Sequence, residues 1–167
     1  LPDAIDAAGV ALNDAFTITV PVAAGGDGIT HKIIFKQTTS QVASLSATTD
    51  WGISLDDANT DALRAAAVID AINGTVNGAV GYGGNAVSSV YPAGELGLTA
   101  VKGSAATKVD LTMSTAGAAG NVVDVLNAVV NFAEGSKLIV TTFTGGTDDG
   151  GAANGALAAV FYCDANT

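Results

Sequence analysis

Charged residues are scarce in this chain. They make up 13% of its 167 residues, where roughly a quarter is typical of soluble domains. Acidic residues outnumber basic ones by sixteen to six, and the resulting net charge of −10 repels nucleic-acid phosphates and anionic lipid headgroups. The sequence therefore predicts neither a nucleic-acid partner nor a membrane partner. Intrinsic disorder is excluded as well, because 49% of the residues are hydrophobic.

Long apolar runs are absent too. The longest, residues 65–69 and 156–162, fall far short of the roughly 18–20 residues that cross a bilayer. Residue 1 is leucine and no basic segment precedes an apolar one. We therefore expect no transmembrane segment, and we expect the chain to be either a processed product or the ordered part of a longer one.

Cysteine and histidine occur once each. Cys163 has no second cysteine for an intramolecular disulfide, and His31 has no second histidine with which to build a usual zinc site. A serine nucleophile would need a histidine base, but His31 lies between Ile29 and Ile33 in a predicted strand, and the chain has no Gly-x-Ser-x-Gly motif. We interpret His31 as a half-exposed structural residue and Cys163 as a small buried or semi-buried thiol. The sequence thus predicts no enzyme and no catalytic residue.

Glycine is abundant, with 21 residues, but its runs match no cofactor motif. No Gly-Lys-Ser/Thr follows them, and no Gly-x-Gly-x-x-Gly joins a strand to a helix. Two aspartate pairs, Asp56 with Asp57 and Asp148 with Asp149, are interpreted as turn-forming residues, because neither matches a calcium-loop pattern. We predict no cofactor, no metal and no small-molecule substrate; a hard cation at Asp148 and Asp149 remains an open alternative.

Alternating apolar residues predict the strands. Residues 16–20 and 29–35 alternate on either side of the glycine-rich turn at 23–28, which predicts a hairpin, and residues 108–114 give the cleanest alternation in the chain. Residues 51–55 are either a short strand or a loop. Weaker signals predict further strands at residues 75–80, 98–101, 137–143 and 156–162.

Two segments have the helical spacing i, i+3, i+4, i+7. The first is capped by Asn59 or Thr60, stops at Gly74, and buries Ala65, Val68, Ile69 and Ile72. The second is capped by Asn121, stops at Gly135, and buries Val122, Val125, Leu126 and Val129. Together with the strands they predict an α+β fold: a mainly antiparallel or mixed sheet with two helices packed on one face.

Two segments are the least able to bury themselves against their own domain. They are an N-terminal arm, residues 1–14, and a glycine-rich insert at about 75–97 in a single domain that spans residues 15–167. Because so few charges keep copies apart, we predict self-association, with both segments ordered by neighbouring subunits. Aromatic and apolar residues dominate such contacts, so Tyr82, Val90 and Tyr91 are the candidate assembly residues.

The order of several short motifs is similar to that of a known family. After the hairpin strands come a helix ending VIDAING at residue 74, a strand VDLTM at 109–113, the stretch TAGAAGN at 115–121 and the stretch FTGGTD at 143–148. This order resembles a module of tailed-bacteriophage structural proteins, which occurs in capsid decoration proteins, tail sheath and tube-like proteins and virion fibres. The likeness covers about residues 15–150.

The resemblance implies a non-enzymatic protein of the virion, the extracellular particle, whose partners are further copies of itself and other virion structural proteins. It favours a capsid decoration (cement) protein, because a short single-domain chain suits that role. The alternatives are a tail component (sheath, tube or fibre) or a secreted or cell-surface adhesion module, which shares the low charge and the threonine-rich strands. The family offers no catalytic residues to assign to this chain.

Overall fold

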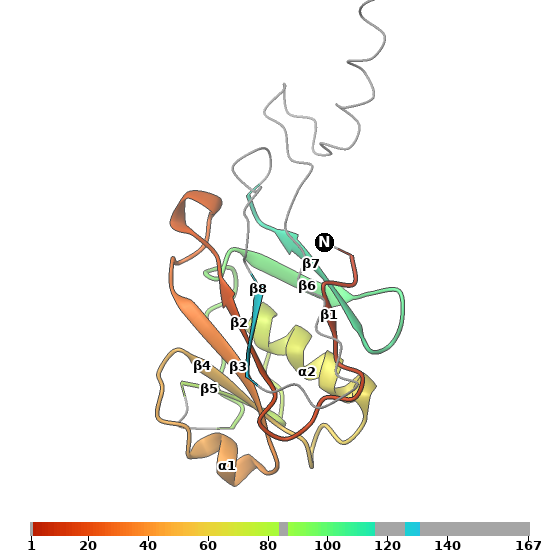
Figure 1. The fold of residues 1–167 in the computed structure, drawn as a ribbon. Coiled ribbons are helices and arrows are strands. Elements are labelled where there is room, and N and C mark those ends of the chain that lie inside the picture. The colour runs from red at the N-terminus through yellow and green to blue at the C-terminus, as the bar shows by residue number, and fades with distance from the viewer. Residues whose placement is uncertain (1, 84–86, 116–125, 131–167) are drawn as a thin grey trace, which may run out of the picture.

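Two β-sheets and two α-helices make up the fold in a computed structural model that describes residues 2–83, 87–115 and 126–130 (Figure 1). The α+β class, with antiparallel and mixed pairing, is therefore as predicted. In chain order the elements are β1 (Ile5–Asp6), β2 (Ala15–Thr19), a 3-10 turn (Val22–Ala24), β3 (Thr30–Lys36), α1 (Thr39–Ala43), β4 (Asp50–Ser54), α2 (Asp61–Asn73), β5 (Val80–Tyr82), β6 (Leu98–Lys102), β7 (Lys108–Met113) and β8 (Leu126–Val130).

The larger sheet has five strands in the order β5-β4-β3-β2-β8. β2 and β3 form the predicted hairpin, in which Phe16 pairs with Ile33, and β3 lies parallel to β4, in which Ile33 pairs with Trp51. Because side chains alternate along a strand, these three paired residues share one face, and all three are buried. The alternation therefore fixes which face of the sheet lines the core. Residues 51–55, open between strand and loop in the sequence, contain most of β4.

A short helix lies on the opposite face of this sheet. Parallel neighbours such as β3 and β4 need a connection that crosses the sheet, and α1 is the helix of that connection. It packs over Gly52: a Cβ at Gly52 would lie 2.7 Å from Cγ1 of Val42, so the approach requires glycine. The sequence did not predict α1, because a five-residue helix is too short to show a helical period.

The predicted first helix is confirmed as α2. The Thr60 hydroxyl accepts a hydrogen bond from the Leu63 N–H at 3.2 Å, and Gly74 ends the helix with a φ of 66°, a conformation that favours glycine. Ala65, Val68 and Ile72 are buried as predicted. Ile69 is only half-buried, however, and Ala67 and Ala71 complete the buried face.

The smaller sheet has the order β1-β7-β6, and it corrects the predicted N-terminal arm. Ile5 of β1 pairs with Val109 of β7 in the same chain, and Ala4, Ala7 and Val10 are buried in the core. Residues 1–14 were expected to be ordered by a neighbouring subunit, but the described residues 2–14 include a strand that pairs with β7 of the same chain and three side chains buried in its core, while Leu12 is 46% exposed. They are part of the domain.

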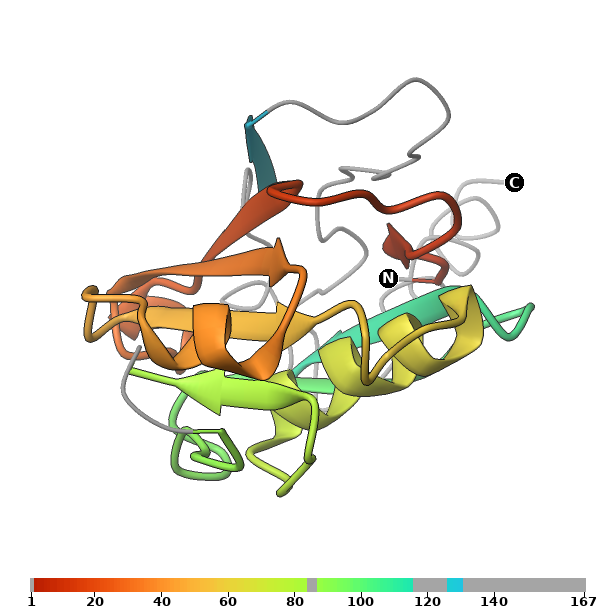
Figure 2. The same cartoon turned by 90° about the horizontal axis from the view of Figure 1, so that it is seen from below.

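Helix α2 lies alongside β6 and β7 and also contacts the core face of β4, whereas α1 packs on β4 from the other side (Figure 2). The two helices thus contact opposite faces of the five-stranded sheet rather than the single face that was predicted, because α1 belongs to the crossover between parallel strands β3 and β4. At the end of α2, the Asn73 side chain reaches β6: its Nδ2 donates to the Ala100 carbonyl at 2.7 Å, and its Oδ1 accepts from the Ala100 N–H at 2.8 Å.

The predicted second helix is wrong where the structure describes it. Residues 126–130 form β8, which pairs antiparallel with β2, with Leu126 opposite Ile18 and Ala128 opposite Phe16. Valines favour strands, and the open edge of β2 offers backbone hydrogen bonds that a local apolar period cannot reveal. The cap at Asn121, the predicted strands at 137–143 and 156–162, Cys163, and Asp148 with Asp149 lie outside the described residues. In the described part of the chain, no helix is long and apolar enough to cross a membrane.

Candidate functional site

The predicted assembly residues separate in the structure. Tyr91 is buried and Tyr82 is half-buried against the core, while Val90 is exposed. Both tyrosine rings pack inward against His31 and Trp51, with ring centroids 4.9 Å apart for His31 and Tyr91 and 5.2 Å apart for Trp51 and Tyr82. Tyr82, Val90 and Tyr91 were expected to contact other subunits; Tyr91 is buried in its own domain, whereas Tyr82 keeps part of its surface exposed and Val90 is exposed.

We call Asp27, His31, Trp51, Tyr82 and Tyr91 the aromatic cluster. Asp27 lies in the β2–β3 turn, where its Oδ1 accepts a hydrogen bond from the Ile29 N–H at 2.9 Å. Its Oδ2 accepts from the Tyr91 hydroxyl at 2.5 Å and contacts Nε2 of His31 at 2.6 Å. One carboxylate therefore ties the hairpin turn to β3 and to the glycine-rich insert.

His31 is more deeply placed than the sequence suggested. It was expected to be half-exposed, but its side chain is 0% exposed, because the Tyr82, Tyr91 and Trp51 rings cover it. Its Nδ1 lies 2.9 Å from the Thr49 carbonyl oxygen, an atom that can only accept. With Nε2 on Asp27, both ring nitrogens of His31 are engaged by oxygen atoms of the chain.

The electrostatics of the cluster reinforce these bonds. Partial burial acts to raise the pKa of the Asp27 carboxyl, but hydrogen bonds from Tyr91, His31 and the Ile29 N–H outweigh it and hold this pKa below the usual 3.8. Burial, followed by the hydrogen bond to Asp27 and its negative charge, raises the pKa of Tyr91 well above its usual value. Tyr91 thus remains a hydrogen-bond donor, and Asp27 remains an acceptor, over a wide pH range.

The contacts of the cluster join the hairpin turn, β3 and the loop of Tyr91. The His31 ring has no exposed surface and both its nitrogens are engaged, so it presents no free base. Nε1 of Trp51 is buried and has no hydrogen-bond partner among the described residues, and its ring packs against the neighbouring rings. Sequence reasoning missed this cluster, because only a turn aspartate four residues before a strand histidine hints at it.

The aspartates considered for a cation have partners within the chain. Asp56 accepts a hydrogen bond from the Gln37 side chain, and Asp57 accepts one from the Ser54 hydroxyl at 2.5 Å. Both follow β4 and stabilise its end, in agreement with their interpretation as turn residues. Among the residues that the structure describes, no group of three or more histidine, cysteine or acidic side chains is placed to hold a metal ion.

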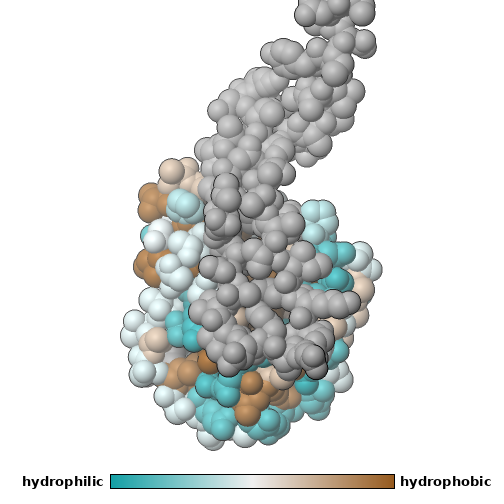
Figure 3. All heavy atoms as spheres, viewed as in Figure 1, coloured by the Kyte–Doolittle hydropathy of each residue, from teal (hydrophilic) through white to brown (hydrophobic). Residues whose placement is uncertain are grey.

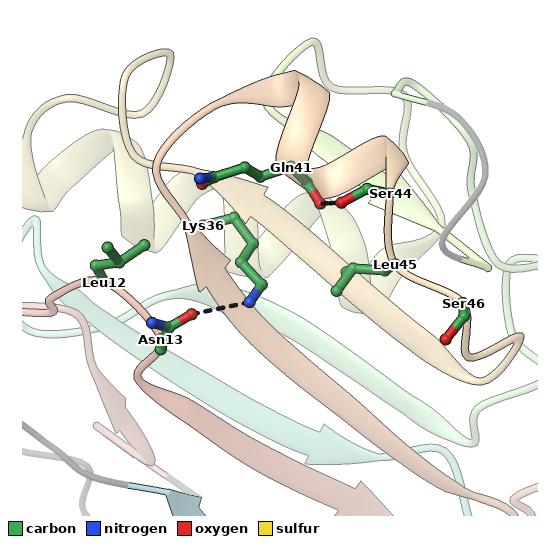
Figure 4. Close-up of a pocket in the computed structure, with 7 residues that line it drawn as sticks. All are labelled: Leu12, Asn13, Lys36, Gln41, Ser44, Leu45 and Ser46. Atoms are coloured by element: carbon green, nitrogen blue, oxygen red, sulfur yellow. Dashed lines mark hydrogen bonds between the residues drawn. The ribbon is translucent and has the colours of Figure 1, made fainter.

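An open groove of about 360 Å³ lies on the other side of the molecule from the cluster's turn, between α1 and the segment that precedes β2 (Figure 4). Lys36 lies between Leu12 and Leu45, and its Nζ donates to Oδ1 of Asn13 at 2.8 Å. No carboxylate of the described residues forms an ion pair with Lys36. The groove thus combines two apolar walls with one ammonium group; its other lining residues are Gln41, Ser44 and Ser46.

Apolar side chains are exposed at the β2–β3 turn. Val22 is 71% exposed and Ile29 is 45% exposed, and apolar atoms gather over this turn at the upper left of Figure 3. The turn is rigidly built: Gly25 takes a φ of 86°, and a Cβ at Gly26 would lie 2.3 Å from the Val20 carbonyl oxygen. The turn therefore presents two apolar side chains from a fixed backbone.

Comparison of the chain with family models, with curated proteins and with solved structures finds no match.

Proposed function

We propose that this protein is a non-enzymatic structural component of a tailed-bacteriophage virion, and that it acts as a capsid decoration protein. The proposal begins from the order of motifs between residues 16 and 148, which resembles that of phage structural modules. Its partners are further copies of the chain and other virion structural proteins, and its location is the virion.

The observation that carries the proposal is the exposed apolar turn. Val22 and Ile29 are held in solvent by a glycine-constrained backbone, on a chain of which only 13% is charged. Large apolar side chains that are exposed together on a rigid element commonly mark a surface that meets another protein. A lattice protein needs such a surface, because it must be fully folded before it binds.

The aromatic cluster supports a structural role. In many enzymes the aspartate of a histidine–aspartate pair binds one imidazole nitrogen, and the other nitrogen remains accessible to the substrate. Here Nδ1 of His31 is bonded to the Thr49 carbonyl and Nε2 to Asp27, beneath the tyrosine rings. The pair is used to fasten the hairpin turn, which keeps the exposed apolar side chains in place.

Quantitative protein analysis of purified particles tests the function. A copy number comparable with that of the major capsid protein, in particles that lose this chain and keep their tails, supports decoration. A copy number comparable with that of tail subunits would instead place the chain in a sheath, tube or fibre. Absence from every particle would refute the virion role and leave the adhesion module as the remaining alternative.

A further inference from the structure

The β2–β3 hairpin has two unlike ends. At one end lies the turn that carries Val22 and Ile29, and at the other lies the groove, since Leu12 and Asn13 precede β2 and Lys36 is the last residue of β3. The five residues of β2 separate these ends by about 17 Å. The two surfaces thus lie at opposite ends of a single pair of strands.

The turn end is apolar and acidic. Besides Val22 and Ile29 it carries Glu95, because contacts on both sides of Glu95 bind its loop to the turn. Tyr91 donates to Asp27, and Gly97 packs so closely on Gly25 that a Cβ at Gly97 would lie 2.5 Å from the Gly25 carbonyl oxygen. Glu95 is exposed, and it forms no ion pair with a described residue.

The groove end places one lysine between two leucines, and its other lining side chains are polar and uncharged. Leu12 is 46% exposed and Leu45 is half-buried, and the Lys36 ammonium lies between them. Lys36, like Lys32 and Lys102, forms no ion pair with a described carboxylate, but of these three lysines it is the one that lines this groove, beside two leucines. It is the complement that an acidic, apolar partner requires.

We propose that the turn end of one copy docks in the groove of a second copy, so that the chain associates head to tail. Val22 and Ile29 then pack against Leu12 and Leu45, and the Glu95 carboxylate pairs with the Lys36 ammonium. The proposal rests on the proposed function in that a virion structural protein assembles with its own copies. Since the two docking surfaces differ, the contact is heterologous and generates rings or open filaments rather than a closed two-fold dimer.

Charge reversal tests the contact. The full chain and its variants Lys36→Glu and Glu95→Lys are compared by sedimentation velocity at low ionic strength, with circular dichroism to verify folding. Each reversal places like charges together, and we expect each to weaken self-association about tenfold. Lys102→Glu is the matched control for Lys36→Glu: it makes the same change in net charge at an exposed position on β6, outside both surfaces, and leaves association at the level expected from net charge alone.

A mixture distinguishes this geometry from others. In an equimolar mixture of the two single variants, the Lys36→Glu variant keeps Glu95 on its turn, and the Glu95→Lys variant keeps Lys36 in its groove, so these two surfaces are complementary. The other pairing brings the new lysine at position 95 to the new glutamate at position 36 and is complementary as well. Association is therefore expected to return in the mixture and in the double variant. If Lys36→Glu weakens self-association and neither the mixture nor the double variant with Glu95→Lys restores it, the assigned charge pair is overturned. A wild-type chain that remains monomeric at high concentration would overturn head-to-tail docking, while the copy number in virions would still decide the proposed function.

The apolar part of the contact has its own pair of variants. Leu12→Ser removes a groove wall, whereas Leu63→Ser changes a leucine of similar exposure, 48%, on α2. We expect weaker association for the first variant and no change for the second. Equal association of the two variants would contradict the groove as the docking surface.

Discussion

Two halves of the same sheet face are stabilised in different ways. One half holds Phe35 and Ile53 in the same buried apolar cluster as Val68 and Ile72 of α2. The other half holds the aromatic cluster, where His31 is joined by hydrogen bonds to Asp27 and to the Thr49 carbonyl. Burial of apolar area is non-directional and independent of pH. The cluster instead depends on the direction of each hydrogen bond and on the protonation of its members.

This contrast separates what holds the domain together from what holds the turn in place. The apolar half joins α2 to both sheets, so it carries the global stability. The aromatic cluster joins the hairpin turn, β3 and the loop of Tyr91, all at the proposed docking end of the molecule. Substitutions in the apolar half should lower the unfolding free energy of the whole domain. Substitutions in the aromatic cluster should first alter the structure of the hairpin turn.

The largest effect is expected from Ile72→Ala. This side chain is 2% exposed, and its loss leaves a cavity between α2 and the sheet, so the free energy of unfolding should fall by about 2–5 kcal/mol. Leu63→Ala removes a leucine that is 48% exposed on the same helix and should cost far less. Denaturant titration measures both, and equal losses would contradict the placement of the core face of α2.

The next largest effect is expected from Asp27→Asn. The amide keeps the size of the side chain but removes the charge that accepts from His31 and Tyr91, so unfolding should become easier by about 1.5–3 kcal/mol. Asp56→Asn is the control, because Asp56 is an exposed carboxylate outside the cluster. An Asp27→Asn variant as stable as the Asp56→Asn variant would show that the cluster is held by ring packing alone.

The pH dependence distinguishes the two halves directly. The folded pKa of Asp27 lies below the unfolded value of 3.8, so its contribution is complete above pH 3.8 and is lost as the pH falls through the lowered value. The folded pKa values of Tyr82 and Tyr91 lie above 10.0, so their contributions are complete below pH 10.0 and are lost as the pH rises through the raised values. Fluorescence of Trp51, the sole tryptophan, reports the cluster.

The acid limb of that titration has an internal control. In Asp27→Asn the fluorescence of Trp51 should no longer follow the titration of Asp27, whereas in Ile72→Ala it should still do so. An unchanged acid transition in Asp27→Asn would assign it to another carboxylate.

The smallest effect separates the two tyrosines. The Tyr91 hydroxyl donates to Asp27 at 2.5 Å, so Tyr91→Phe should cost about 1 kcal/mol. The Tyr82 hydroxyl lies 3.5 Å from Nδ1 of His31, which is already bonded to Thr49, so Tyr82→Phe should change stability very little. Thermal unfolding measures the difference, and the reverse order of the two variants would contradict the hydrogen-bond assignment.

The sequence predicted the elements whose patterns are local. The hairpin of β2 and β3, helix α2 and strands β6 and β7 show their period within a few residues and match the structure closely. Helix α1 was not predicted because it belongs to the crossover between two parallel strands. The need for a crossover follows from the pairing of the strands and not from the local sequence. Residues 126–130 were predicted as helix because their apolar spacing fits both structures, and pairing with a strand more than a hundred residues away decides between them.

The candidate site was predictable only in part. Exposed turn residues follow from the glycine pattern, but Tyr91 meets Asp27 across 64 residues of sequence, and no periodicity encodes such a contact. The same limit explains the N-terminal segment: Ile5 finds its partner in Val109, so the segment looked unpartnered in the sequence although it is paired in the fold.

Asn73 has a consequence for how copies of this chain can meet. Its amide occupies both the N–H and the C=O of Ala100, on the side of β6 that faces away from β7, and so imitates one residue of a further strand. An incoming backbone would have to displace this amide before it could extend the smaller sheet. Through β6, therefore, the protein resists becoming a continuous β-ribbon, and any assembly at that edge must be made by side chains.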